Sequence, residues 1–147
     1  MSNLSIFYAD DDEDDIMFFN DAVDSVATSH TNIIELHIHK NGENLVEGIM
    51  NNKFKNGVVF LDVNMPKKSG LELLKEIRNE PTIYQVPVVM YSTSSSKVDI
   101  EMSLNFGANY YAIKPYDFND LIKMISDVSK INWMSHKPDL NNFILVK

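Results

Sequence analysis

The stretch VVFLD, residues 58–62, decides how this chain is expected to fold. Four apolar residues, two of them β-branched, run without interruption into a single carboxylate, which is typical of a strand that is buried on both faces. The segment PVVMY, residues 87–91, has the same character and begins with proline, which the first position of a strand tolerates. Such strands occur in parallel sheets covered by helices, so both segments predict an α/β domain.

On both sides of these two strands, segments with the residue pattern of a strand alternate with segments that have the pattern of a helix. Further strands are expected at residues 4–9, 34–39 and 110–113; the second of these alternates strictly between apolar and polar side chains, as at a sheet edge. Helices, with Asp12 and Ser69 as expected caps, are predicted near residues 12–26, 43–52, 69–77 and 117–128. We expect a loop at residues 27–32.

One segment, residues 97–106, gives conflicting signals. Its apolar residues recur with period two, which favours a strand. However, it lies between two predicted parallel strands, and parallel strands need a crossover connection, which is usually a helix. We therefore expect a helix here.

Length and composition limit the classes of function. The 147 residues are enough for one domain, and 44% hydrophobic and 23% charged residues are typical of a globular protein. The absence of cysteine excludes disulfides, thiolate metal sites and cysteine nucleophiles. A formal net charge of −8, concentrated in consecutive acids at residues 10–15, argues against nucleic-acid binding. No signal peptide or membrane span is recognisable, so we expect a cytoplasmic protein without membrane insertion.

Reactive side chains follow four of the predicted strands. Asp10 and Asp11 end the first, Asp62 the third, Ser92 the fourth and Lys114 the fifth. Ligand sites in such sheets lie at the carboxyl ends of the strands. Clustered carboxylates need a cation, and an all-oxygen site suits Mg²⁺, while lysine adds a positive charge for an incoming phosphate. The set predicts a phosphoryl-binding site with a nucleophilic carboxylate, whereas the missing glycine-rich loop excludes dinucleotide binding.

Four motifs in this order resemble the receiver domain of two-component response regulators, over about residues 4–130. They are FYADD (7–11), LDVNMP (61–66), VVMYST (88–93) and YYAIKP (110–115). The resemblance implies an α/β, flavodoxin-like doubly wound fold, with five parallel strands in the order 2-1-3-4-5 and helices on both faces. Residues 1–130 would form the receiver domain, and 131–147 an extension of the last helix plus a tail, with no separate output domain.

The resemblance also implies residue roles. Asp62 would be the phosphorylated aspartate. Mg²⁺ would be held by Asp62 together with Asp10, Asp11 and the backbone carbonyl of Asn64. Lys114 would pair with the phosphoryl group.

Two further positions match the switch of the family. Ser92 would be the switch hydroxyl, and Tyr111 matches the aromatic that turns toward the interior. A fixed packing role for Tyr111 stays open as an alternative. The Lys114–Pro115 bond would be the cis peptide of the family.

The expected function is that of a stand-alone, chemotaxis-regulator-like receiver, and not of an enzyme. A sensor histidine kinase or histidine phosphotransfer protein would phosphorylate Asp62, and binding to an unidentified protein partner would change; a homodimer is possible. The alternatives are an aspartate-nucleophile phosphohydrolase and a constitutive interaction module. Asn64 argues against the hydrolase, because a general acid is expected at that position.

Two histidines and the C-terminal tail lie outside these motifs. His37 and His39 could bind a metal, but an exposed sheet edge accounts for them better. The tail from Trp133 to Lys147 could pack on the body, pair with a sheet edge, or exchange between two molecules. We expect it to pack against the domain.

Overall fold

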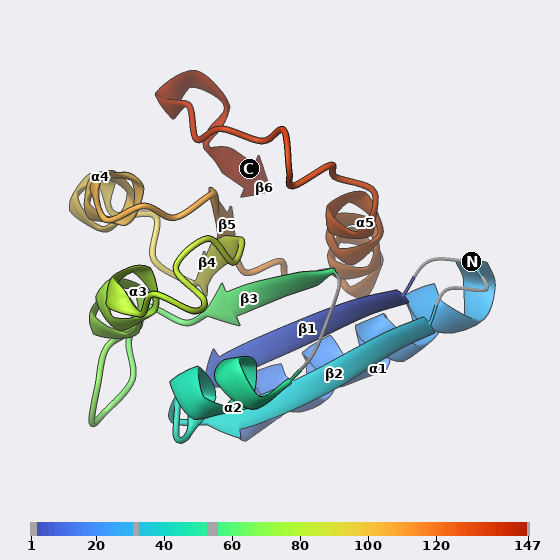
Figure 1. The fold of residues 1–147 in the computed structure, drawn as a ribbon. Helices are drawn as coiled ribbons and strands as arrows, with labels where there is room; N and C mark the ends of the chain where they lie inside the picture. Colours follow the sequence, from blue (N-terminus) through green and yellow to red (C-terminus); the bar gives the residue numbers. More distant parts are fainter. Residues whose placement is uncertain (1–2, 31–32, 53–55, 147) are drawn as a thin grey trace.

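A computed structural model describes residues 3–30, 33–52 and 56–146. Its centre is a parallel sheet whose strands are ordered β2-β1-β3-β4-β5-β6 (Figure 1). The strands are β1 (Asn3–Asp10), β2 (Ile33–Lys40), β3 (Gly57–Leu61), β4 (Val88–Ser92), β5 (Tyr110–Ile113) and β6 (Ile144–Val146). The predicted order of the first five is confirmed, and all neighbouring pairs are parallel.

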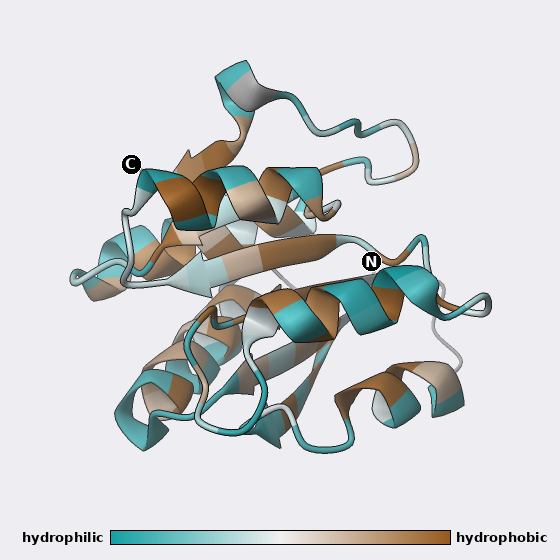
Figure 2. Ribbon diagram, turned by 90° about the vertical axis from the view of Figure 1, so that its left-hand side faces the viewer, coloured by the Kyte–Doolittle hydropathy of each residue, from teal (hydrophilic) through white to brown (hydrophobic). Residues whose placement is uncertain are grey.

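Within the described ranges, five α-helices cover the two faces of the sheet. They are α1 (Glu13–His30), α2 (Leu45–Asn51), α3 (Gly70–Asn79), α4 (Lys97–Asn105) and α5 (Phe118–Ser129). One apolar cluster joins the sheet to α1 and α5, and the other joins it to α2, α3 and α4. In Figure 2, hydrophobic and hydrophilic residues alternate along the helices that cover the sheet. The doubly wound fold is thus confirmed.

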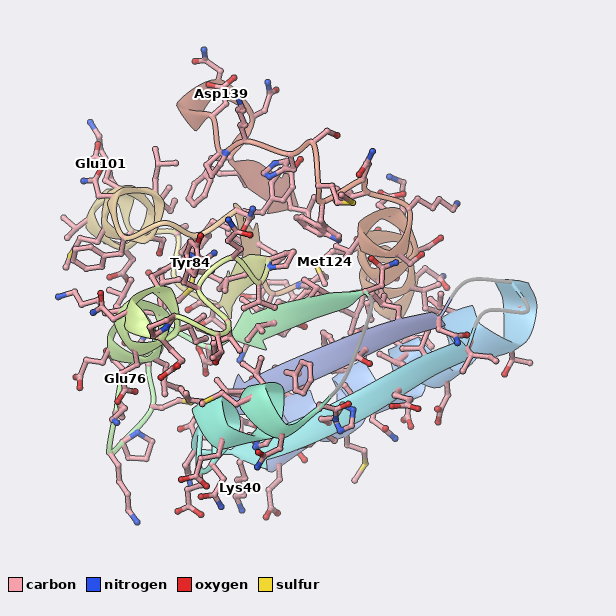
Figure 3. The ribbon with its side chains drawn as sticks, in the orientation of Figure 1. Lys40, Glu76, Tyr84, Glu101, Met124 and Asp139 are labelled. Atoms are coloured by element: carbon pink, nitrogen blue, oxygen red, sulfur yellow. The ribbon has the colours of Figure 1, made fainter. Side chains whose placement is uncertain are left out.

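The burial of side chains explains why these segments adopt their structures. Every residue of β3 and β4 is buried, as the uninterrupted apolar runs predicted. Met124 lies on the side of α5 that packs on the sheet, whereas Glu76 and Glu101 lie on the outer sides of α3 and α4 (Figure 3). None of the helices in the described ranges has an apolar stretch long enough to span a bilayer.

Helix starts follow from polar side chains at the predicted positions. The Asp12 carboxylate accepts hydrogen bonds from the backbone N–H groups of Asp14 and Asp15 and caps α1. Ser69 caps α3 in the same way, by accepting from the N–H of Glu72. The ambiguous segment is the helix α4, so the crossover argument was correct and the period-two pattern misleading.

The predicted five-stranded sheet was wrong by one strand. The tail forms β6, which pairs with the outer edge of β5, and the Tyr111 N–H donates to the Phe143 carbonyl at 2.9 Å. Phe143 is 1% exposed and packs in the cluster under α3 and α4. The tail therefore both packs on the domain and pairs with a sheet edge.

Two smaller predictions were also wrong. The loop expected at residues 27–32 is helical as far as His30, because no glycine or proline stops α1, and residues 31–32 lie outside the described ranges. The edge position of β2 is confirmed, but its histidines are half-buried. The His37 ring stacks on Phe7 with a centroid distance of 4.8 Å, and Gly48 of α2 lies against the His39 ring.

A half-buried guanidinium joins the loops at the amino ends of β4 and β5. Arg78 of α3 donates to the carbonyl oxygens of Tyr84, Val86 and Gly107 and to the side chain of Asn109, at 2.6 to 3.1 Å. All five of its N–H donors are used. Burial lowers the pKa of Arg78 to about 10, so the group stays charged at neutral pH.

Candidate functional site

The carboxyl ends of four strands bring the predicted site residues together. Asp10 is the last residue of β1 and Ser92 of β4, while Asp62 and Lys114 directly follow β3 and β5. The arrowheads of β1 and β3 point to the same side of the molecule (Figure 1). Parallel strands end at one edge, so residues 104 positions apart in the chain become neighbours.

Lys114 is the centre of this cluster. Its ammonium nitrogen lies 2.8 Å from Oδ2 of Asp10, 2.8 Å from Oδ2 of Asp15 and 3.4 Å from Oδ2 of Asp62. Its side chain is 8% exposed. Burial opposes its charge, but the hydrogen bonds from Lys114 to Asp10 and Asp15 raise its pKa above the usual value. The lysine is therefore a fixed cation in the site.

Asp10 accepts four hydrogen bonds, which fix its carboxylate in the site. Its Oδ1 accepts from the backbone N–H groups of Asp11 and Asp12, and its Oδ2 accepts from the Tyr8 hydroxyl and from Lys114. Burial would raise the pKa of Asp10, but the hydrogen bonds from Lys114 and Tyr8 hold it below its usual value. Asp10 is thus ionised and rigidly oriented.

Asp62 differs from Asp10 in its environment. Burial, together with the charge of Asp10, raises the pKa of Asp62 to about 7, although the charge of Lys114 opposes the shift. The backbone N–H of Asn64 approaches its Oδ1 at 3.4 Å. Asp62 therefore has few hydrogen bonds of its own, and its oxygens are available to another ligand.

Three carboxylates of the site can share a cation. Asp10, Asp11 and Asp62 each offer an oxygen, and these oxygens lie within 4.8 Å of one another. Asp11 is exposed, whereas the other two are buried. An all-oxygen set that is open to solvent on one side fits a hard divalent ion such as Mg²⁺, which keeps several waters.

The predicted switch residues lie beside this cluster. The Ser92 oxygen accepts from the N–H of Ser94 at 3.1 Å. The Tyr111 ring is fully buried, and its hydroxyl donates to the Ser94 carbonyl at 2.8 Å. The aromatic ring thus already lies in the interior.

The prediction of a cis peptide was wrong: the Lys114–Pro115 bond is trans. The Lys114 N–H donates to the Ser92 carbonyl at 2.8 Å, which continues the pairing of β5 with β4 by one residue. The lysine side chain reaches the acids from this trans backbone.

Three residues of the site were not predicted. Tyr8 precedes Asp10 by two residues on β1 and thus shares its face, a spacing that could have identified it. Asp15 lies in the first turn of α1, where its pairing with Lys114 depends on the packing of α1. At Gly70, a Cβ atom would lie 2.1 Å from the Asp62 carbonyl oxygen, so only glycine lets α3 begin this close to the site.

The fold and the site together define a receiver domain of the kind found in response regulators. The family model of the response regulator receiver domain matches residues 6–126. The chain therefore belongs to this family, as its four motifs predicted.

Individual relatives agree with this assignment. Response regulator Rcp1 of Synechocystis sp. is 33% identical over 88 residues, 60% of this chain and 59% of Rcp1. A chemotaxis protein CheY homolog of Campylobacter jejuni is 35% identical over 71 residues, 48% of this chain and 55% of the homolog. The chain thus spans less than two thirds of either relative.

Solved structures share the fold over more of the chain. The phosphorylated cyanobacterial phytochrome response regulator RcpA matches with a TM-score of 0.72 and 28% identity, covering 89% of this chain and 94% of RcpA. The Mn²⁺-bound form of Rcp1 matches with a TM-score of 0.69 and 24% identity, covering 92% of this chain and 98% of that structure. The chain is therefore similar to a phytochrome response regulator and to a chemotaxis protein CheY homolog.

Proposed function

We propose that this protein is a cytoplasmic response regulator whose receiver domain accepts a phosphoryl group on Asp62 from a sensor histidine kinase or a histidine phosphotransfer protein. A carboxylate oxygen of Asp62 attacks phosphorus, the P–N bond to the donor histidine breaks, and the imidazole leaves with the electron pair. The observation that carries the proposal is the position of the Lys114 ammonium, bonded to Asp10 and 3.4 Å from Asp62. It can pair with a phosphoryl oxygen at that carboxylate.

Asp10, Asp11, Asp62 and the Asn64 carbonyl would hold Mg²⁺. When bound, this ion neutralises negative charge on the phosphoryl group and on the carboxylates. The clustering of the three acids supports this role, and so does the Mn²⁺-bound form of the relative Rcp1. The four hydrogen bonds to Asp10 keep the donor set in place before an ion arrives.

Phosphorylation would be transmitted through Ser92 and Tyr111. A phosphoryl group on Asp62 offers an acceptor to the Ser92 hydroxyl, which draws the end of β4 inward. That movement displaces Ser94, whose carbonyl anchors the Tyr111 hydroxyl. The Tyr111 N–H also pairs with Phe143, so the change reaches β6 and the surface around it. A protein partner, or a second copy of the chain, would recognise this surface.

Acetyl phosphate with Mg²⁺ tests the proposal directly. We expect a mass gain of about 80 Da, one phosphoryl group, in the wild type but not in Asp62→Asn. Asp99→Asn is the matched control. Asp99 lies outside the site and accepts a hydrogen bond from the Ser94 hydroxyl, so this variant should still form the adduct. A wild-type protein that never gains the mass would refute the proposal.

The two alternatives have less support. A phosphohydrolase would need a general acid near Asp62, but Asn64 contributes only its backbone N–H to that carboxylate. An interaction module that never reacts would have no use for a buried lysine held among three carboxylates. Unchanged partner binding by Asp62→Ala in cells would nevertheless favour the second alternative.

A further inference from the structure

Asp15 is an acid of the site for which the phosphoryl chemistry described so far has no use. It lies in the first turn of α1, and its carboxylate contacts Lys114 at 2.8 Å. That distance is shorter than the 3.4 Å between Lys114 and the acceptor Asp62. The side chain of Asp15 is 36% exposed, whereas that of Asp10 is fully buried. Asp15 is thus the accessible partner of the lysine.

We propose that Asp15 is a positioning residue that holds Lys114 back from Asp62 in the unmodified protein and thereby restrains phosphorylation. This inference rests on the proposed function. It assigns the regulation of the phosphorylation rate to a single side chain. Removal of the Asp15 carboxylate should make Asp62 a faster phosphoryl acceptor.

The donors of Lys114 give the first reason. An ammonium group has three N–H donors, and Asp10, Asp15 and Asp62 can occupy all three. A phosphoryl oxygen can bond to Lys114 only if one acid gives up its place. Asp10 is fixed by Tyr8 and two backbone N–H groups, and it has no access to water. Asp15 can be solvated when it releases the lysine, so it is the acid that gives way.

Charge gives the second reason. Acetyl phosphate and phosphohistidine both bring negative charge to the site, and Asp15 adds a carboxylate to the three that are already there. Neutral asparagine at this position would reduce the repulsion of the phosphoryl donor and would hold Lys114 less strongly than the carboxylate does.

A variant in the same helical turn provides a matched control. Asp14 is exposed, and its loss removes one negative charge from the same end of α1. Within the described residues, the Asp14 carboxylate makes no ion pair and no side-chain hydrogen bond. Asp14→Asn therefore reports the effect of charge alone, whereas Asp15→Asn also replaces the ion pair with Lys114 by a weaker, uncharged acceptor. Asp15→Glu retains the carboxylate and should behave as the wild type.

The test measures the initial rate of the mass adduct with acetyl phosphate at saturating Mg²⁺. We expect Asp15→Asn to react about two- to fivefold faster than Asp14→Asn. This ratio corresponds to the interaction energy that a partly exposed ion pair contributes. In protein labelled with ¹⁵N-lysine and kept free of metal, the Lys114 ammonium resonance should shift in Asp15→Asn but not in Asp14→Asn or Asp15→Glu. This second measurement reports the contact itself.

Two failures can be told apart. If the wild type forms no adduct, the proposed function is wrong. If the wild type reacts and Asp15→Asn is no faster than Asp14→Asn, or if the Lys114 resonance does not move, the proposed function stands and the role of Asp15 is overturned.

Discussion

Asp62→Asn should make the metal-free protein more stable at neutral and alkaline pH, although it removes the proposed phosphoryl acceptor. Burial raises the pKa of Asp62 from 3.8 to about 7 in the folded chain. The difference of about 3 units corresponds to about 4 kcal/mol of destabilisation when the buried carboxylate is fully ionised. Asparagine avoids this cost and can still accept from the N–H of Asn64.

The pH dependence follows from the direction of the shift. Below about pH 4 the acid is protonated in both the folded and the unfolded chain, so it adds no difference. Between about pH 4 and 7 only the unfolded chain releases the proton, and the wild type loses stability as the pH rises. Above about pH 7 the loss is complete. The advantage of Asp62→Asn should therefore grow from pH 4 to 7 and then stay constant.

Urea and thermal unfolding in EDTA between pH 5 and 9 measure this advantage. The shift of the Asp62 pKa already includes the opposing charge of Lys114, so we expect asparagine to bring a gain of about 2–4 kcal/mol at pH 8, or about 5–15 °C in Tm. Saturating Mg²⁺ should reduce the difference in stability between the two proteins, since it binds the folded wild type more tightly than folded Asp62→Asn. The exposed Asp14→Asn should show no such gain. Equal or lower stability of Asp62→Asn at pH 8 would refute the reasoning.

Three other substitutions test separate parts of the structure. Phe143→Ala should lower the free energy of unfolding, measured in urea, by about 3–5 kcal/mol, because a buried ring is lost. Met134 is 99% exposed, so Met134→Ala should change this free energy little. Equal effects of the two substitutions would contradict the packing of the tail. Arg78→Lys should cost about 2–4 kcal/mol by the same measurement, because carbonyl oxygens lose donors, and a neutral result would argue against this bonding. Lys114→Gln should slow adduct formation at least about tenfold, whereas the exposed Lys123→Gln should not; equal rates would remove Lys114 from the chemistry.

Most of the fold could be predicted because local patterns and topology agree. The runs at residues 58–62 and 87–91 identified buried strands, and the need for a crossover identified α4 against its own periodicity. Because parallel strands end at one edge, the meeting of Asp10, Asp62 and Lys114 followed from the order of the elements alone. Metal binding, the Asn64 carbonyl and switching by Ser92 and Tyr111 stay predictions.

What could not be predicted depends on contacts between distant segments. The run Phe143–Val146 is too short to indicate by itself whether it pairs with an edge, packs, or exchanges between molecules. The contact of Asp15 with Lys114 depends on the angle at which α1 leaves β1, and six consecutive acids give no sign of which one turns inward. The trans bond before Pro115 contradicts an expectation that came only from resemblance.

The sixth strand changes where this domain can be cut. The family match ends at residue 126, but a chain shortened to that point would lose the strand that protects the outer border of β5. Unsatisfied main-chain groups and the vacated Phe143 pocket would then face water, and such an open border invites pairing with other molecules. A chain that ends at residue 126 should therefore aggregate. Binding experiments with it would detect nonspecific association at the exposed edge of β5 and not recognition of a specific partner.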